Sequence, residues 1–216
     1  MTTPSQSKSY VIIVGVDYAE LGDLALEHAC EMAKAHEPSH LHVVHVTTLN
    51  PSHSDTRDEA WSRGFKEAST RLHEHAEQVI KTWRDAHALT VPFARLTTHV
   101  RTGSPADAIA QLASDVEADL VVVGTHGRPG ARRFVLGSVA ERTMRLAPCP
   151  VLVVRPPDVT VPEIEPPCPR CIETRRATEG KEIWCAQHRE HHDKRHTYHY
   201  EINVDTHQSG FLIHME

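Results

Sequence analysis

The first 155 residues of the chain predict an α/β fold built on a doubly wound parallel sheet. Short runs rich in Val and Ile recur through this part, and such runs are typical of strands buried on both faces. Longer segments between them carry apolar residues three or four positions apart, which is the spacing of amphipathic helices. Strands that alternate with helices form parallel sheets with right-handed crossovers.

Five strands and four helices are expected. The strands are expected at residues 10–16, 41–46, 93–100, 120–123 and 151–154. The helices are expected after residue 17, over residues 61–83, and from residues 105 and 138 onward. Ser138, with Glu141 three residues later, has the spacing of a capping box, so we expect Ser138 to cap the fourth helix.

The strongest functional signal lies in residues 119–155. A buried strand there ends at Gly124, a polar loop containing Gly127 follows, and a helix begins at Gly137 and Ser138. Glycines let backbone N–H groups approach a phosphate closely, and a helix N-terminus adds a partial positive charge. The loop is neither a Walker loop nor a GxGxxG dinucleotide turn. It predicts an anion site at the carboxyl edge of the sheet, where ligands of doubly wound sheets bind.

Two sequence features resemble the universal stress protein family, and its ATP-binding branch in particular. They are the spacing Gly124-x2-Gly127-x9-Gly137-Ser138 and the closing sequence APCPVLVVR, and the resemblance covers residues 1–155. The resemblance implies a Rossmann-like sheet of the adenine nucleotide alpha hydrolase type, with strand order 3-2-1-4-5. It also implies a homodimer paired through the fifth strand. The implied ligand is ATP, or ADP or AMP, with or without Mg²⁺, and the implied role is a stress-response sensor or regulator.

The resemblance also assigns residues to the nucleotide. Asp17 is expected beside the adenosine, and its alternative role is to cap the first helix. Val46 is expected to contact the adenine through its backbone, and its alternative role is simply core packing. Arg132 and Arg133 of the loop either screen phosphate charge or face solvent. The full expected set is Val16, Asp17, Val46, Val123, Gly124, His126, Gly127, Arg128, Gly137, Ser138 and Val139.

No catalytic residues are predicted. The glycine loop is accompanied by no Walker lysine, paired carboxylate metal site or evident base for water. The sequence therefore favours nucleotide binding and sensing over turnover, and it leaves enzymatic activity open. The alternative functions are a zinc-stabilised interaction scaffold and a slow ATPase.

A zinc site is predicted in a separate C-terminal module. Residues 156–167 form a proline-bearing linker, and the module is expected over residues 168–216, with a strand at residues 195–204. Two pairs of ligands, thirteen residues apart, are expected to form two short turns around one Zn²⁺ ion: Cys168, Cys171, Cys185 and His188. A filled tetrahedral shell indicates a structural site. His191, His192 and His196 are alternatives for the fourth ligand.

Charge and composition exclude several classes of partner. The net charge of −6 and the acidic balance of the tail argue against nucleic acid, so a protein is the expected partner of the tail. No apolar run approaches the roughly 18 residues of a membrane helix, and the first residues make a poor signal peptide. A cytoplasmic location is therefore expected, and the five cysteines should there be thiols or metal ligands.

Overall fold

The computed structural model describes residues 8–47, 59–88, 93–125, 136–156, 167–189, 191–192 and 197–198. Residue contacts divide the chain into two units, Met1–Thr160 and Val161–Glu216, and each unit is considered by itself. Most of the predicted linker, residues 157–166, lies outside the described part of the chain.

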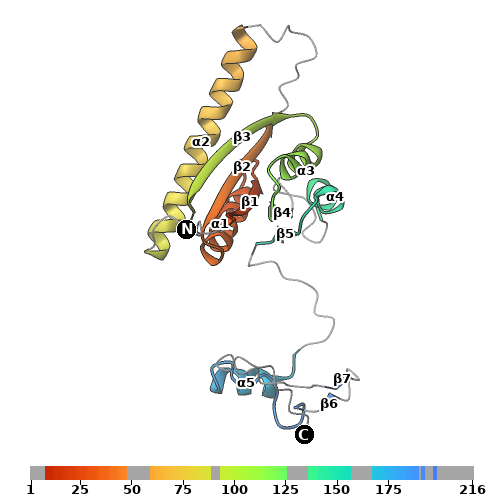
Figure 1. Cartoon of the computed structure of the whole chain (residues 1–216). Helices are drawn as coiled ribbons and strands as arrows, with labels where there is room; N and C mark the ends of the chain where they lie inside the picture. Colours follow the sequence, from red (N-terminus) through yellow and green to blue (C-terminus); the bar gives the residue numbers. More distant parts are fainter. Residues whose placement is uncertain are drawn as a thin grey trace, which may run out of the picture. The chain divides into compact units, whose positions relative to one another are not determined.

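Five parallel strands form the sheet of the first unit, in the order β3-β2-β1-β4-β5 (Figure 1). They are β1 (Tyr10–Gly15), β2 (Ser39–Thr47), β3 (Arg95–Thr102), β4 (Leu120–Gly124) and β5 (Val151–Val154). The prediction of a doubly wound parallel sheet with order 3-2-1-4-5 is confirmed. After β3 the chain returns to the other side of β1, so the strand order reverses between β1 and β4.

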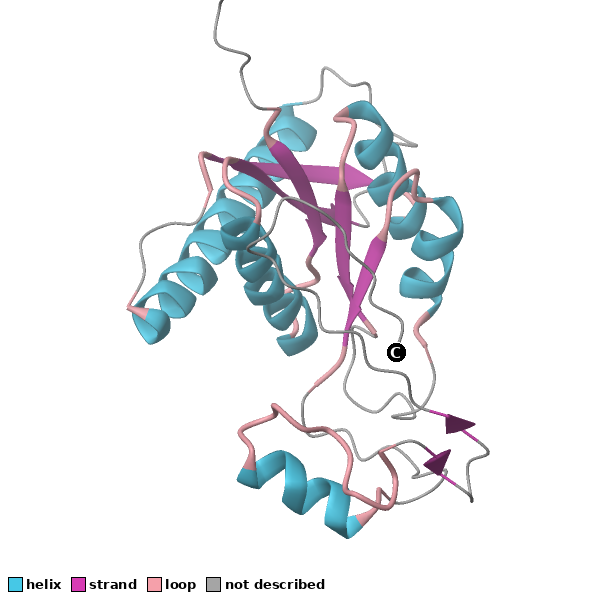
Figure 2. Cartoon of the chain, turned by 60° about the horizontal axis from the view of Figure 1, so that its bottom comes forward, coloured by secondary structure: helices cyan, strands magenta, loops and turns pink. Residues whose placement is uncertain are grey.

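Two pairs of helices cover the two faces of this sheet (Figure 2). α1 (Glu20–Ala35) and α2 (Glu59–His87) pack on one face, and α3 (Pro105–Asp115) and α4 (Ser138–Leu146) pack on the other. None of the helices in the described ranges is long and apolar enough to cross a membrane.

The central strand β1 is buried from both sides. Ile12 and Val14 pack under α1 and α2, Ile13 between them packs under α3, and all three side chains are fully buried. Each such burial stabilises the fold by about 2 kcal/mol. Because neither face of β1 meets water, its sequence is apolar throughout and does not alternate with polar residues.

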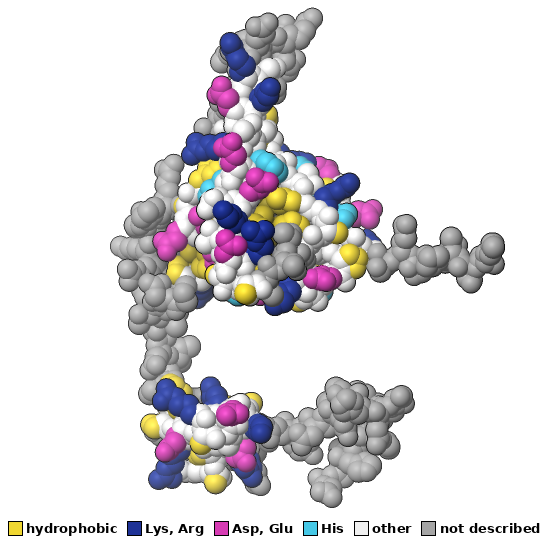
Figure 3. Space-filling model, turned by 90° about the vertical axis from the view of Figure 1, so that its left-hand side faces the viewer, with side chains coloured by type: hydrophobic (Ala, Val, Ile, Leu, Met, Phe, Trp, Pro, Cys, Tyr) yellow, Lys and Arg dark blue, Asp and Glu magenta, His cyan; other side chains and the backbone are white. Residues whose placement is uncertain are grey.

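α2 is amphipathic, as its sequence period predicted. Its inner side buries Leu72, Ile80 and Trp83 against the sheet and α1. Trp83 Nε1 donates to Glu31 Oε1 at 2.9 Å, so the indole N–H is satisfied where the ring is buried. Figure 3 shows its outer side, where basic and acidic side chains are interspersed and do not gather by sign.

The second unit, in its described residues, contains a helix and a short antiparallel strand pair. The helix is α5 (Pro169–Ala177), and the strands are β6 (His191–His192) and β7 (Thr197–Tyr198). The sequence predicted a turn where α5 lies, and that prediction is wrong. Pro169 directly follows the N-cap residue Cys168, and proline at the first helical position favours a helix start. Of the strand expected at residues 195–204, only Thr197 and Tyr198 lie among the described residues.

Two histidines pair across neighbouring strands of the sheet. The rings of His42 on β2 and His99 on β3 stack with centroids 5.2 Å apart, and His42 Nδ1 lies 2.9 Å from His99 Nε2. One imidazole can accept this hydrogen bond only through a nitrogen without a proton. Burial lowers the pKa of His42 to about 4, and the nearby His99, His40 and Arg95 add to the shift. Burial also lowers the pKa of His99, with a further contribution from Arg101.

This pair should make the fold sensitive to mild acid. In the unfolded chain His42 takes up a proton near pH 6.5, whereas in the folded protein it resists protonation until about pH 4. The pair's contribution to stability is therefore full above pH 6.5 and falls as the pH drops from 6.5 towards about 4. We expect His42→Phe, which keeps an aromatic ring but cannot be protonated, to lose less stability than the parent on acidification.

Thermal unfolding at about pH 7 and about pH 5, followed by circular dichroism, measures this difference. His28→Phe, at an exposed position on α1, is the matched control and should keep the pH dependence of the parent. Equal losses of melting temperature in His42→Phe and the parent would contradict the assignment.

Candidate functional site

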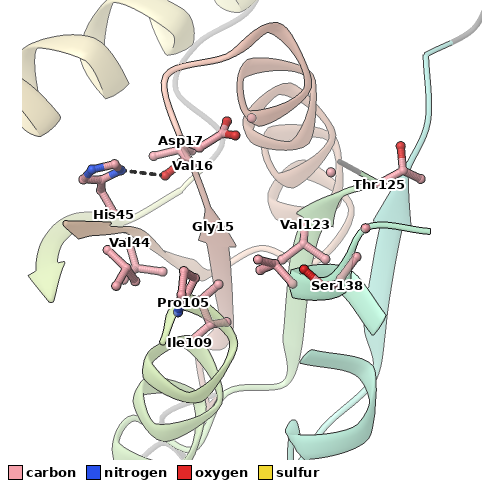
Figure 4. A pocket seen from close by; sticks show the side chains of 16 residues that line it. Gly15, Val16, Asp17, Val44, His45, Pro105, Ile109, Val123, Thr125 and Ser138 are labelled. Carbon is pink, nitrogen blue, oxygen red and sulfur yellow. Dashed lines mark hydrogen bonds between the residues drawn. The ribbon is translucent and has the colours of Figure 1, made fainter. Parts of the chain in front are cut away.

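A cavity lies where the carboxyl ends of β1, β2 and β4 meet the N-terminal ends of α3 and α4 (Figure 4). Its volume is about 520 Å³, which is within the usual range of small-molecule sites. The predicted nucleotide residues that line it are Val16, Asp17, Val46, Val123, Gly124, Gly137, Ser138 and Val139. His126, Gly127 and Arg128 lie outside the described residues, as do Arg132 and Arg133.

Asp17 lies at the rim of the cavity, just beyond the end of β1. It is exposed, and its Oδ1 accepts a hydrogen bond from Ala19 N–H at 3.2 Å. Ala19 is the N-cap of α1, so the alternative expectation that Asp17 caps this helix is wrong. Tyr18 between them has a positive φ of 60°, which turns the chain sharply from the strand into the helix.

Two glycines let the elements around the rim approach closely. A Cβ atom on Gly22 of α1 would lie 2.8 Å from Asp17 Oδ1 and 3.1 Å from Asp17 N. A Cβ atom on Gly124 would lie 2.9 Å from the carbonyl oxygen of Leu21. A larger residue at either position would push the first turn of α1 away from the ends of β1 and β4, so these glycines set the width of the cavity.

One wall of the cavity is apolar and belongs to the core. Val16, Val44 and Val123 are each at most 5% exposed, and Ile109 of α3 is 3% exposed. Branched side chains that are fixed in a close-packed core leave the cavity little freedom to collapse. The wall therefore offers a preformed surface on which a flat apolar ring can pack.

The N-terminus of α4 brings backbone amides to the cavity. Glu141 N–H donates to Gly137 O at 3.0 Å and is the first amide of α4 with an acceptor in the helix, so the amides of Ser138 and the two residues after it have none there. Gly137 N–H donates to Thr125 O at 2.6 Å, which holds the helix start beside the end of β4. Gly137 is the N-cap and no side-chain capping bond forms, so the predicted cap at Ser138 is wrong.

The cavity is also lined by residues that the sequence did not assign to the nucleotide. They are Gly15, Gly22, Val44, His45, Pro105, Ile109, Thr125 and Ala140. Pro105 and Ile109 could have been found, because a helix start after a parallel strand lies at the ligand-binding edge. Thr125 is 5% exposed, and its hydroxyl has no hydrogen-bond partner within the described part of the chain. Gly22 and His45 carry no sequence signal that separates them from ordinary helix and strand residues.

Four potential metal ligands converge in the second unit. The ligand atoms of Cys168, Cys171, Cys185 and His188 all lie within 4.8 Å of one another. Cys171 Sγ lies 3.5 Å from His188 Nδ1, and it accepts a hydrogen bond from Cys185 N–H at 3.5 Å. Three thiols and an imidazole are a ligand set typical of structural Zn²⁺. His196 and the side chains of His191 and His192 lie outside the described residues.

The surroundings of this cluster act on its thiols in opposite directions. The backbone N–H of Cys171 lowers the pKa of Cys168, which lies at the N-cap of α5. Burial raises the pKa of Cys171, which is 3% exposed. A cation at the centre of the cluster would stabilise every thiolate around it and so oppose the effect of burial. The geometry of the cluster is therefore compatible with a bound metal.

The remaining cysteines belong to the α/β unit. Cys30 on α1 is fully buried, and burial raises the pKa of its thiol to about 12. Burial also raises the pKa of Cys149. Both thiols are free, and a neutral buried thiol packs as a small apolar side chain.

Known proteins are similar to the α/β unit in sequence and in fold. A universal stress protein of Methanocaldococcus jannaschii is 30% identical over 149 residues, which cover 68% of this chain and 82% of that protein. Universal stress protein G of Salmonella typhimurium is 34% identical over 148 residues, which cover 68% of this chain and 99% of that protein. The solved structure of universal stress protein UspA from Lactobacillus plantarum has a TM-score of 0.54 at 24% identity, covering 69% of this chain and 100% of its own.

The family can be assigned from the sequence of the α/β unit. The profile of the universal stress protein family matches residues 10–155, which is more than half of the chain. The tail from residue 156 onward lies outside this match. With the profile, the relatives and the fold in agreement, the chain belongs to the universal stress protein family.

Proposed function

We propose that the α/β unit binds an adenine nucleotide, with ATP as the main ligand, and that the bound nucleotide regulates the protein's interactions in a stress response. The observation that carries this proposal is the cavity, in which the start of α4 and an apolar wall of valines face one space. Helix N-terminal amides bind phosphate, and a purine base packs on apolar side chains. The phosphates would lie at Gly137 and Ser138, and the base would lie near Val16 and Val46.

The choice of adenine is supported by the family pattern. Gly124, Gly137 and Ser138 line the cavity at the spacing that resembles the ATP-binding branch. Asp17 stands at the rim, where the resemblance expects the adenosine, and a carboxylate can accept hydrogen bonds from ribose hydroxyls. ADP and AMP share this base and sugar, so they would occupy the same cavity with fewer phosphate contacts.

We propose binding without appreciable turnover. Among the described lining residues the one carboxylate is Asp17, and its Oδ1 accepts a hydrogen bond from Ala19 N–H. The one imidazole among them is His45, and its Nδ1 is bonded to the backbone of Val16. A slow ATPase, the alternative function, would need a general base that reaches water beside the phosphates, whereas Asp17 and His45 both stand next to Val16, where the adenine would lie.

We propose that one Zn²⁺ ion, held by Cys168, Cys171, Cys185 and His188, stabilises the second unit. Four protein ligands would fill a tetrahedral shell and leave no position for a substrate, so the ion would be structural. Within residues 167–189, Cys171 and Cys185 are the buried residues. Because the described part of this unit has no apolar core of its own, metal binding and folding would be coupled.

The remaining proposals concern assembly and location. β5 lies at the edge of the sheet, and Met144 and Leu146 on α4 are 43% and 44% exposed. An open strand edge and exposed apolar side chains favour association, which supports a homodimer through β5. We propose a cytoplasmic protein whose tail docks a protein partner.

Saturating ATP should raise the melting temperature of the full chain by roughly 5–10 °C, because a ligand that binds only the folded state stabilises it by mass action. Gly137→Val should abolish this rise. Gly137 has φ −64° and ψ 146°, which valine adopts without strain, so the new side chain would obstruct the cavity rather than unfold the protein. Thermal unfolding with and without ATP at millimolar concentration measures the effect.

Ser114→Val is the control for this substitution, because Ser114 is exposed on α3 and lies outside the cavity lining. It should keep the full ATP-dependent rise. The absence of any ATP-dependent rise in the parent protein would refute nucleotide binding.

Purified protein should carry adenine nucleotide and release it chemically unchanged on denaturation, because Asp17 and His45 of the described lining would lie at the adenine end of the site and away from the phosphates. Mass spectrometry of the released nucleotide and a phosphate-release assay measure this. Phosphate release above background that disappears in Gly137→Val would establish an ATPase instead.

The protein as purified should contain about one Zn²⁺ per chain, and Cys171→Ser should lose most of it, because one missing ligand opens the tetrahedral shell. Metal analysis measures the zinc content. Limited proteolysis of Cys171→Ser should cut the second unit while the α/β unit stays intact. Cys149→Ser, which lies outside the cluster, should keep the metal. Full zinc content in His188→Ala, with loss in a variant of His191, His192 or His196, would reassign the fourth ligand.

A further inference from the structure

We infer that His45 is a positioning residue of the cavity. Its imidazole holds the carbonyl of Val16 and thereby leaves the amide of Val46 available to a ligand. The inference rests on the proposed nucleotide site for its functional meaning, but its evidence is the backbone hydrogen bonding between β1 and β2.

The pairing of β1 and β2 is regular up to the cavity. The strands run in parallel register as far as Gly15 opposite Val44. One residue further, Val16 N–H donates to Val44 O at 2.9 Å. In a parallel ladder each residue that donates in this way also accepts from the residue two positions beyond its acceptor. The next bond would therefore run from Val46 N–H to Val16 O.

The structure replaces that bond with a side chain. Among the described residues, no backbone hydrogen bond joins Val46 N–H to Val16 O. Instead His45 Nδ1 lies 2.9 Å from Val16 O, as the dashed line in Figure 4 marks. A carbonyl oxygen can only accept, so Nδ1 carries the proton and donates it. The ladder ends here, at a point where Val16 and Val46 both line the cavity.

His45 is itself braced on its other side. The centroid of its ring lies 4.4 Å from the centroid of the Tyr18 ring. The Tyr18 centroid in turn lies 5.0 Å from the centroid of the His75 ring and 4.5 Å from Cζ of Arg71. His75 Nε2 lies 2.7 Å from Asp23 Oδ1, which ties this group to α1 as well as α2. With the ring fixed between two helices and the sheet, its hydrogen bond to Val16 has a fixed direction.

The consequence is a backbone donor, the Val46 amide, that has lost its Val16 acceptor among the described residues at the base end of the cavity. Removing an unpaired backbone N–H from water costs free energy. A ligand atom that accepts a hydrogen bond from this N–H offsets that cost. A purine ring nitrogen is such an acceptor, and the neighbouring valine side chains would hold the ring in plane. His45 thus acts on the ligand through Val16 and Val46.

Hydrogen exchange of the Val46 amide, measured by NMR on the full chain without nucleotide, tests the backbone part of the inference. In the parent this amide should exchange rapidly, and the imidazole nitrogen shifts of His45 should report the Nδ1–H tautomer. His45→Phe keeps a ring against Tyr18 but donates nothing, so Val16 O can accept from Val46 N–H and the exchange should slow at least about tenfold. A protected Val46 amide in the parent, or unchanged exchange in His45→Phe, would overturn the inference.

Calorimetric titration with ATP and with adenosine tests the functional part. His45→Phe should weaken the binding of both by about tenfold, which is the effect of one lost hydrogen bond. His45→Asn, whose side-chain amide can donate from close to the Nδ1 position, should recover most of the affinity. A loss seen with ATP and not with adenosine would overturn the role at the base end. If the parent binds neither ligand, the proposed function fails, and exchange of the Val46 amide still decides whether His45 interrupts the ladder.

Discussion

The parallel pairing of β1 with a strand on each side fixes where the cavity can form. β1 pairs with β2 from Tyr10 to Gly15 and with β4 from Ile12 to Val14, so its carboxyl end is fixed from two directions. Because all five strands are parallel, their carboxyl ends lie at one edge, and the strand order reverses there between β1 and β4. The position of the cavity follows from this topology and does not depend on any single side chain.

Close approach of backbone, rather than polar side chains, then gives the cavity its chemistry. Gly22 and Gly124 bring α1 against the strand ends, and the start of α4 directs its amides into the same space. The described lining contains no Lys or Arg, so the attraction for an anion at these residues comes from the helix terminus. The proposed recognition of phosphate therefore depends on backbone geometry at the start of α4.

The sequence pattern predicted the sheet well, because a strand buried on both faces is a continuous run of apolar residues. β5, for example, spans the expected Val151–Val154. Features that depend on a few hydrogen bonds, such as helix starts, were harder to predict from the sequence. The capping-box spacing at Ser138 could not show that Gly137 makes the turn into α4, and the paired cysteines concealed the start of α5 at Pro169. His45 resembles any half-buried strand residue in sequence, because its role depends on a carbonyl 29 positions earlier in the chain.

The two units are stabilised by different interactions, so a change in conditions would affect them differently. The α/β unit has a core cluster on each face of its sheet, so a ligand adds to a fold that is already stable. In residues 167–189 the buried side chains are Cys171 and Cys185, which belong to the Cys/His cluster proposed to hold a metal. Any condition that removes a metal or oxidises a thiol would therefore act on the second unit first. If both proposed sites are occupied, the nucleotide and the metal would stabilise separate parts of one chain.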